Sequence, residues 1–168
     1  MNAPKEPSRI TNYKFVKETH QGELPWVRIA DLAKMKLKHP VVLLNGCFDL
    51  LHSGHMKVIF HARRHAKTLI CAMDSDALTN LNKPGRPINS WVERATALGY
   101  MPIDYLVEIN TSKEFVELVE AIKPDLRVKG AEYREHLSRI QDVPTLFVRD
   151  GGIRTSEIVR RIKNAKYS

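Results

Sequence analysis

Two histidines, His52 and His55, stand three residues apart, with Gly54 between them, soon after a short apolar run. The apolar run predicts a strand and the residues after His55 predict a helix, so the pair falls where that helix begins. The N–H groups at a helix N-terminus point outward, and the helix dipole favours negative charge there. Glycine lets the backbone come close to a ligand, and imidazoles donate hydrogen bonds to phosphate oxygens. The spacing therefore predicts an anion site suited to the breaking of a phosphoryl bond.

Three other interpretations of this segment stay open from the residues alone. The histidines could be ordinary loop residues, or they could bind a metal together with His61 and His65, four residues apart on the next helix. Cys47 could act as a nucleophile, although a small buried apolar role suits an isolated cysteine better. No cysteine pair or HExxH-type glutamate accompanies the histidines, so no metal site is expected.

The elements that must position this segment alternate along the chain. The expected strands are residues 41–44, 68–73, 105–109, 125–128 and 145–148. The expected helices are residues 55–67, a helix capped by Ser90 that ends near Leu98, one capped by Ser112 and stopped by Pro124, and one from about Ser156. Residues 74–89 are expected to form a polar loop because they are rich in proline and glycine. This alternation predicts an α/β fold, a three-layer Rossmann-like domain with a five-stranded parallel sheet, whose ligands bind beyond the carboxyl ends of the strands.

The composition is that of an ordinary folded domain with unevenly distributed positive charge. Of 168 residues, 43% are hydrophobic and 27% are charged, which excludes disorder as the global state. Residues 1–40 hold 8 basic and 4 acidic residues and are expected to be a basic extension, followed by one domain at residues 41–168. No run of about 18 apolar residues and no secretory signal occurs, so neither a membrane span nor export is expected. Cys47 and Cys71 suit reduced thiols, which favours a cytoplasmic location.

Residues 45–55, NGCFDLLHSGH, resemble the HxGH signature of the nucleotidyltransferase superfamily, in the form found in cytidylyltransferase-like proteins. The resemblance continues in order at four later places and covers residues 41 to about 165. Its closest form is the adenylyltransferase domain of bacterial ADP-heptose synthesis, and glycerol-3-phosphate and ethanolamine-phosphate cytidylyltransferases are more distant relatives. The later segments are DSD at residues 74–76, KPGRPIN at 83–89, KGAEY at 129–133 and RTSEIV at 154–159.

The resemblance implies that the phosphate of a metabolite attacks the α-phosphorus of a nucleoside triphosphate and that pyrophosphate leaves. Mg²⁺ is expected to accompany the triphosphate, and the protein needs to position groups and stabilise charge. Arg94, in a W-x-E-R pattern, either reaches the phosphates or pairs with a carboxylate. The catalytic residues implied are His52, His55, Lys83, Arg154, Thr155 and Ser156. The nucleotide-binding residues implied are Asn45, Gly46, Cys47, Phe48, Gly54, Arg86, Lys129 and Gly130, and the substrate-binding residues are Asp49, Asp74, Glu132 and Tyr133.

Two departures from the family pattern leave the nucleotide open. Ala131 and Glu132 stand where the heptose enzymes have Gly-Asp, and Arg154 replaces a serine of their STT motif. We favour transfer from ATP to a phosphorylated sugar such as heptose 1-phosphate. The alternative is a CTP-dependent cytidylyltransferase acting on glycerol 3-phosphate or a similar polyol or amino-alcohol phosphate.

An alternative of another class is a non-catalytic module that binds a nucleotide or nucleic acid. The basic extension at residues 1–40 is its only support, and the intact histidine pair argues against it. The expected partners are therefore a nucleoside triphosphate and a small phosphorylated metabolite, without membrane or nucleic acid. A homodimer is possible, and we expect the chain to be the transferase half alone, since no sugar-kinase-like sequence precedes it.

Overall fold

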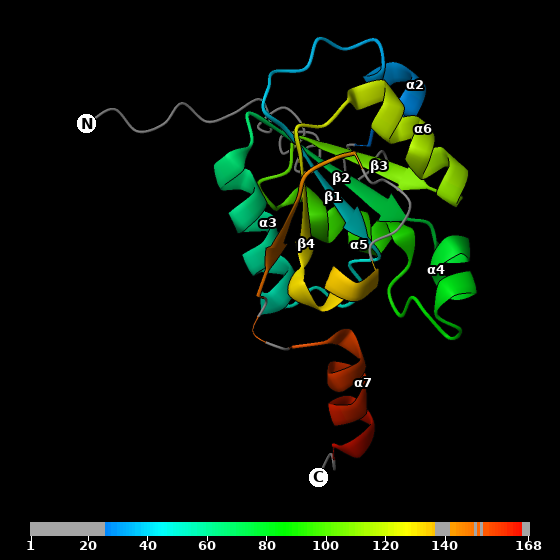
Figure 1. The fold of residues 1–168 in the computed structure, drawn as a ribbon. Coiled ribbons are helices and arrows are strands. Elements are labelled where there is room, and N and C mark those ends of the chain that lie inside the picture. The colour runs from blue at the N-terminus through cyan, green and yellow to red at the C-terminus, as the bar shows by residue number, and fades with distance from the viewer. Residues whose placement is uncertain (1–25, 137–141, 150, 152, 166–168) are drawn as a thin grey trace.

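A five-stranded, all-parallel sheet forms the centre of the protein, which confirms the predicted Rossmann-like α/β fold (Figure 1). The computed structural model describes residues 26–136, 142–149, 151 and 153–165. The strands are β1 Val41–Gly46, β2 Thr68–Asp74, β3 Tyr105–Ile109, β4 Leu126–Gly130 and β5 Thr145–Val148. Their order across the sheet is β3-β2-β1-β4-β5. From β1, successive strands are added on one side as β2 and β3, and on the other side as β4 and β5, so the strand order reverses between β1 and β4. Open α/β sheets bind ligands where the strand order reverses in this way.

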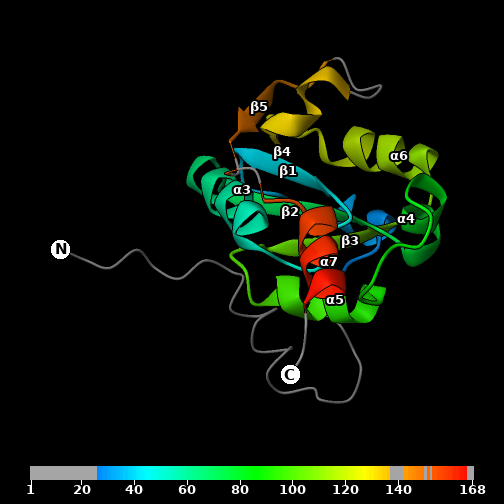
Figure 2. The ribbon, with the colours of Figure 1, turned by 90° about the horizontal axis from the view of Figure 1, so that it is seen from below.

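Helices cover both faces of the sheet, which gives three layers (Figure 2). The helices are α2 Ile29–Leu32, α3 Ser53–His65, α4 Asp76–Asn82, α5 Trp91–Gly99, α6 Ser112–Ile122 and α7 Thr155–Asn164, with a 3₁₀-helix, η1, at Ala131–His136. Of these, α7 buries no residue and projects away from the sheet (Figure 1). On one face, α3 and α5 bury Ile59 and Leu98 against the sheet. On the other face, α2 and α6 bury Leu32 and Leu118. Both faces of β1 and β2 are covered, which explains why these strands are nearly continuous apolar runs in the sequence.

The prediction of a polar loop throughout residues 74–89 is wrong, because α4 forms within it. Ser75 caps this helix by accepting a hydrogen bond from the Leu78 backbone N–H (3.2 Å), and Thr79 is buried. The proline and glycine that favoured a loop lie after the helix ends. The cap of α6 is Thr111 and not Ser112, since the Thr111 hydroxyl accepts from the Glu114 N–H. The predicted Ser90 capping box of α5 is confirmed.

The last part of the expected basic extension lies against the sheet. Leu32 is fully buried. The Val27 backbone N–H donates a hydrogen bond to the Leu106 carbonyl of β3 (2.9 Å). Residues 1–25, which hold much of the expected extension, lie outside the described residues. The boundary at residue 40 therefore stays a prediction. In the part of the chain that the structure describes, no helix is long and apolar enough to cross a bilayer.

Candidate active site

A cavity of about 590 Å³ opens at the carboxyl ends of β1 and β4, where the strand order reverses. Every residue that the sequence assigned to the site lines this cavity, with the exception of Asp74. The loop after β1, the start of α3, the segment after α4, η1 and the start of α7 all contribute to its wall. The fold therefore brings together segments that are far apart in the sequence.

The histidine pair forms one wall of the cavity at the start of α3. His52 is the N-cap of this helix, and its Nδ1 accepts a hydrogen bond from the Gly54 backbone N–H (3.1 Å). Because Nδ1 accepts, the neutral ring carries its proton on Nε2, which is then a donor. The His52 and His55 rings stack with centroids 3.9 Å apart, and Phe48 lies against His55 at 5.4 Å. The two imidazoles thus form a single packed unit beside the helix N-terminus.

A buried carboxylate holds the loop that precedes the histidines. Phe48 and Leu50 adopt φ values of 54° and 46°, a left-handed region that costs a non-glycine residue about 1–2 kcal/mol. Between them, Asp49 is only 4% exposed. Its carboxylate accepts hydrogen bonds from the Arg86 guanidinium (2.6 Å) and from the backbone N–H groups of Ile88 (2.9 Å) and Asn89 (3.0 Å). Asp49 therefore ties the strained loop to residues 86–89, and its role in binding substrate stays a prediction.

The start of α7 reaches the same cavity from the far end of the chain. The Thr155 hydroxyl donates to the Asp49 backbone carbonyl (2.9 Å), which docks α7 on the loop after β1. Arg154 is the N-cap, and its side chain makes no capping hydrogen bond to the first turn. Arg154, Thr155 and Ser156 all line the cavity. Two helix N-termini, those of α3 and α7, therefore lie at one cavity, an arrangement suited to a polyanion.

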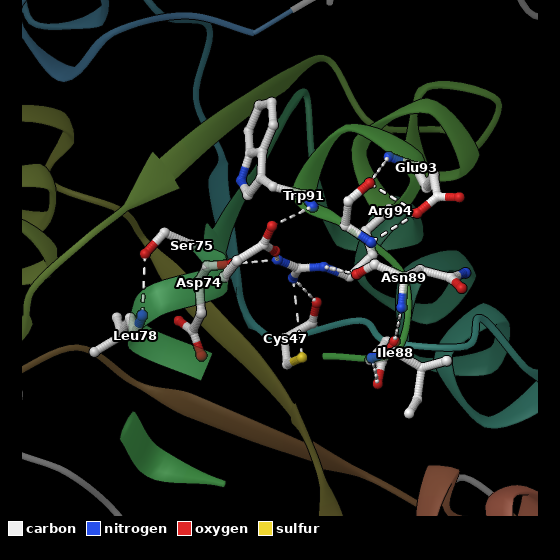
Figure 3. A network of polar contacts seen from close by, with 12 residues as sticks. Cys47, Asp74, Ser75, Leu78, Ile88, Asn89, Trp91, Glu93 and Arg94 are labelled. Carbon is white, nitrogen blue, oxygen red and sulfur yellow. Dashed lines mark hydrogen bonds and ion pairs between the residues drawn. The ribbon is translucent and has the colours of Figure 1, made fainter. Parts of the chain in front are cut away.

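Arg94 does not line the cavity but holds the elements around it (Figure 3). Its side chain is fully buried, and it pairs with the Asp76 carboxylate at 2.7 Å, which was one of the two predicted outcomes. The guanidinium also donates to the backbone carbonyls of Cys47, Asp74 (2.9 Å) and Asn89 (3.2 Å). One side chain thus connects the ends of β1 and β2 with the segment before α5. The sequence pattern indicated the residue but not this positioning role.

Lys129, at the end of β4, is the most strongly perturbed cation of the cavity wall. Its pKa is lowered to about 8, first by burial and then by the nearby charge of Arg127, with Asp74 and Glu132 acting in the opposite sense. Its ammonium group lies 5.0 Å from the centroid of the Tyr133 ring. An anionic ligand would stabilise the charge that burial opposes.

Replacing Lys129 with methionine is expected to stabilise the fold at pH 7. The pKa of Lys129 lies near 10.5 in the unfolded chain and near 8 in the folded one, so the unfolded chain binds the proton more tightly. The stability of the native protein should therefore rise between pH 8 and pH 10.5. At pH 7 the variant should gain about 1–2 kcal/mol in the free energy of unfolding, measured with urea. A loss of stability, or a difference that does not shrink by pH 10.5, would contradict this account.

Asp74 lies at the end of β2, outside the residues that line the cavity. Burial raises the pKa of its carboxyl, and the charges of Arg94, Lys129 and Lys83 oppose this rise. Its assignment to substrate binding stays a prediction. Among the described residues, no group of three or more histidines, cysteines or acidic residues is arranged to hold a metal ion. The rings of His61 and His65 lie 5.3 Å apart on α3.

Comparison with known proteins identifies a family and several relatives. Residues 43–167 match the sequence model of a family described as cytidylyltransferase-like. The chain is 38% identical over 144 residues to the bifunctional protein HldE of Campylobacter curvus, a match that covers 82% of this chain and 30% of the relative. It is 41% identical over 96 residues to HldE of Magnetococcus marinus, covering 56% of this chain and 20% of that protein. The chain therefore spans less than a third of the length of these curated relatives.

Solved structures share the fold at low sequence identity. A lipopolysaccharide core biosynthesis protein from Thermoplasma volcanium matches with a TM-score of 0.52 and 22% identity, covering 65% of this chain and 93% of that chain. Pantothenate synthetase from Thermus thermophilus matches with a TM-score of 0.51 and 16% identity, covering 73% of this chain and 60% of that chain. At these identities the likeness concerns the fold alone.

Proposed function

The chain belongs to the cytidylyltransferase-like family of nucleotidyltransferases, and we propose that it transfers a nucleoside monophosphate from ATP to a phosphorylated sugar such as heptose 1-phosphate, releasing pyrophosphate. One observation carries the proposal: the stacked pair His52 and His55 and the uncapped start of α7 line the same cavity. ATP and the sugar phosphate are favoured because the HldE proteins are similar to this chain over most of its length.

In the proposed reaction, an oxygen of the sugar phosphate attacks the α-phosphorus of ATP. The bond from that phosphorus to the bridging oxygen breaks, and the electron pair leaves with pyrophosphate. The protein contributes position and charge stabilisation. His52 donates from Nε2 to the phosphates, and His55 packs against it as a second imidazole. The first backbone N–H groups of α7 bind the departing phosphates, and the Thr155 hydroxyl, which donates to the Asp49 carbonyl, holds this end of the helix at the cavity.

Three cations support the leaving group in this proposal. Lys83 and Arg86 come from the segment after α4, and Arg154 comes from the start of α7. Arg86 is fixed by its ion pair with Asp49, so its charge is held at the cavity wall. Lys83 and Arg154 are exposed, which leaves them room to move toward bound phosphates.

Members of this family generally use Mg²⁺ with the nucleoside triphosphate. Asp49 and Glu132 are the carboxylates that line the cavity. The Asp49 carboxylate is occupied by Arg86 and two backbone N–H groups, and the described residues contain no cluster of three acidic or histidine ligands. This donor set fits an ion that is held chiefly by the phosphates of the triphosphate. Mg²⁺ commonly binds in this way, with few protein ligands. The ion, when bound, neutralises charge on the phosphates.

The alternative, a CTP-dependent enzyme acting on glycerol 3-phosphate or a similar phosphate, is favoured by Arg154 in the RTS motif. Pyrophosphate release with Mg²⁺ tests both activities. We expect turnover with ATP and heptose 1-phosphate and background release when the sugar phosphate is omitted. Turnover confined to CTP with glycerol 3-phosphate would favour the alternative. A steep salt dependence of oligonucleotide binding without turnover would favour the nucleic-acid-binding module.

The oligomeric state and the cytoplasmic location expected from the sequence stay predictions. Sedimentation of the purified chain tests the homodimer directly.

A further inference from the structure

Arg127, the second residue of β4, is a fully buried cation with few partners. Its side chain is 0% exposed. Nη2 donates to the Asn45 side-chain oxygen (3.2 Å), and the guanidinium carbon lies 5.6 Å from the centroid of the Phe115 ring. Nε and Nη1 are buried and have no hydrogen-bond acceptor among the described residues. Burying a charge in this way is costly unless an opposite charge compensates it.

Within the described residues, no carboxylate forms an ion pair with Arg127. Burial lowers its pKa, and in the part of the chain that the structure describes no negative group opposes that effect. Lys129 follows two residues later on the same face of β4, and its pKa is lowered further by the charge of Arg127. Two cations therefore lie on this face of β4, and Lys129 lies near its carboxyl end. Asp74 and Glu132 partly offset the charge of Lys129, whereas no carboxylate among the described residues pairs with Arg127, so an anion from outside the protein would stabilise the pair.

Asn45 connects Arg127 to the cavity. In β1, the side chains of Val41 and Leu43 pack on the face of α2 and α6, and strand alternation places Asn45 on that face. Asn45 lines the cavity, as does Lys129. A guanidinium only donates hydrogen bonds, so the Asn45 oxygen must turn toward Arg127. The amide nitrogen, which donates, is thereby directed away from Arg127.

We propose that Arg127 is a positioning residue that fixes the Asn45 amide as a donor and that, with Lys129, makes this side of the cavity the subsite for a doubly charged phosphate of the acceptor. The inference rests on the proposed function for the identity of that acceptor. It assigns Asn45 to the acceptor, whereas the family resemblance implied a role in nucleotide binding. The histidines and the start of α7 then serve the nucleotide from the opposite side of β1 and β4.

The sharpest test replaces Asn45 with aspartate. The new carboxylate keeps an acceptor for Arg127, so the fold should be retained, but it presents a negative oxygen where the amide presented a donor. Isothermal titration calorimetry would measure binding of heptose 1-phosphate, and separately of inorganic phosphate, to protein saturated with Mg²⁺ and α,β-methylene-ATP. We expect the Kd for both phosphates to rise at least about tenfold while the Kd for the ATP analogue stays within about twofold.

Arg127→Leu provides the second variant, and Arg134→Leu is its control, because Arg134 also lies over an aromatic ring, at 5.2 Å from Phe147. Arg127→Leu should weaken phosphate binding and leave binding of the ATP analogue unchanged, and the control should change neither. If Arg127→Leu does not fold, Asn45→Asp decides alone. Unchanged phosphate binding in Asn45→Asp, or an equal loss for phosphate and the ATP analogue, would overturn the inference.

The two proposals fail in different ways. Wild-type protein that binds inorganic phosphate at this subsite but releases no pyrophosphate with heptose 1-phosphate would refute the proposed substrate and leave the subsite standing. Wild-type protein that turns over heptose 1-phosphate, with an Asn45→Asp variant of unchanged KM for it, would refute the subsite and leave the function standing.

Discussion

Replacing His55 with alanine is expected to lower kcat by about 10²–10³-fold, the range for removing one donor that stabilises charge in a transition state. His55 lies in the first turn of α3, stacked on His52 and in contact with Phe48. Its loss removes a donor from the cavity and also a ring that holds His52 in place. The KM for the nucleotide should change less than kcat, because the contact strengthens as charge develops on the phosphates.

A matched control is available on the same helix. His65 is exposed near the end of α3 and does not line the cavity, so His65→Ala should keep wild-type turnover. The thermal midpoint of His55→Ala should fall by only a few degrees, since the residue is half-buried and lies outside the apolar core. Wild-type kcat in His55→Ala would remove this histidine from the mechanism.

Replacing Arg94 with methionine is expected to lower the free energy of unfolding by about 3–5 kcal/mol, more than the His55→Ala substitution. The substitution removes the donors for three backbone carbonyls and for the Asp76 carboxylate. Methionine fills much of the same volume, so the loss reports on polar groups rather than on a cavity. Urea denaturation followed by circular dichroism measures it.

Two further variants separate the contributions of this network. Arg94→Lys should recover little, because an ammonium group cannot reproduce the planar fork of a guanidinium. Asp76→Asn should cost about 1–3 kcal/mol, less than Arg94→Met. One amide oxygen cannot accept from both Arg94 and the Trp91 backbone N–H, and the buried guanidinium loses its charged partner. A wild-type midpoint in Arg94→Met would show that the backbone carbonyls find other donors and that Arg94 does not hold the site together.

The cavity wall was predictable from the sequence because its residues lie in short segments at the ends of strands. The strand pattern located those ends, and the HxGH, KPGRPIN, KGAEY and RTSEIV segments supplied the side chains. Pro84, Gly85 and Pro87 concealed α4, whose burial depends on contacts with the sheet and not on local propensity.

The partners of charged side chains were not predictable from the sequence. Asp49 looks like a ligand at a loop, but tertiary contacts turn it inward to Arg86 and two backbone N–H groups. Arg127 was missed altogether, because an arginine within the short run LRV resembles an edge position. One feature could have identified Arg127 as unusual. It is a charged residue in β4, a strand that pairs with the central strand β1 and is therefore expected to be buried.

A crystal structure with Mg²⁺ and α,β-methylene-ATP tests the central claim most directly. The account predicts the triphosphate between the starts of α3 and α7, with His52 Nε2 and a ring nitrogen of His55 within about 3.2 Å of phosphate oxygens. Imidazoles turned away from the phosphates, or binding zinc in their place, would contradict it.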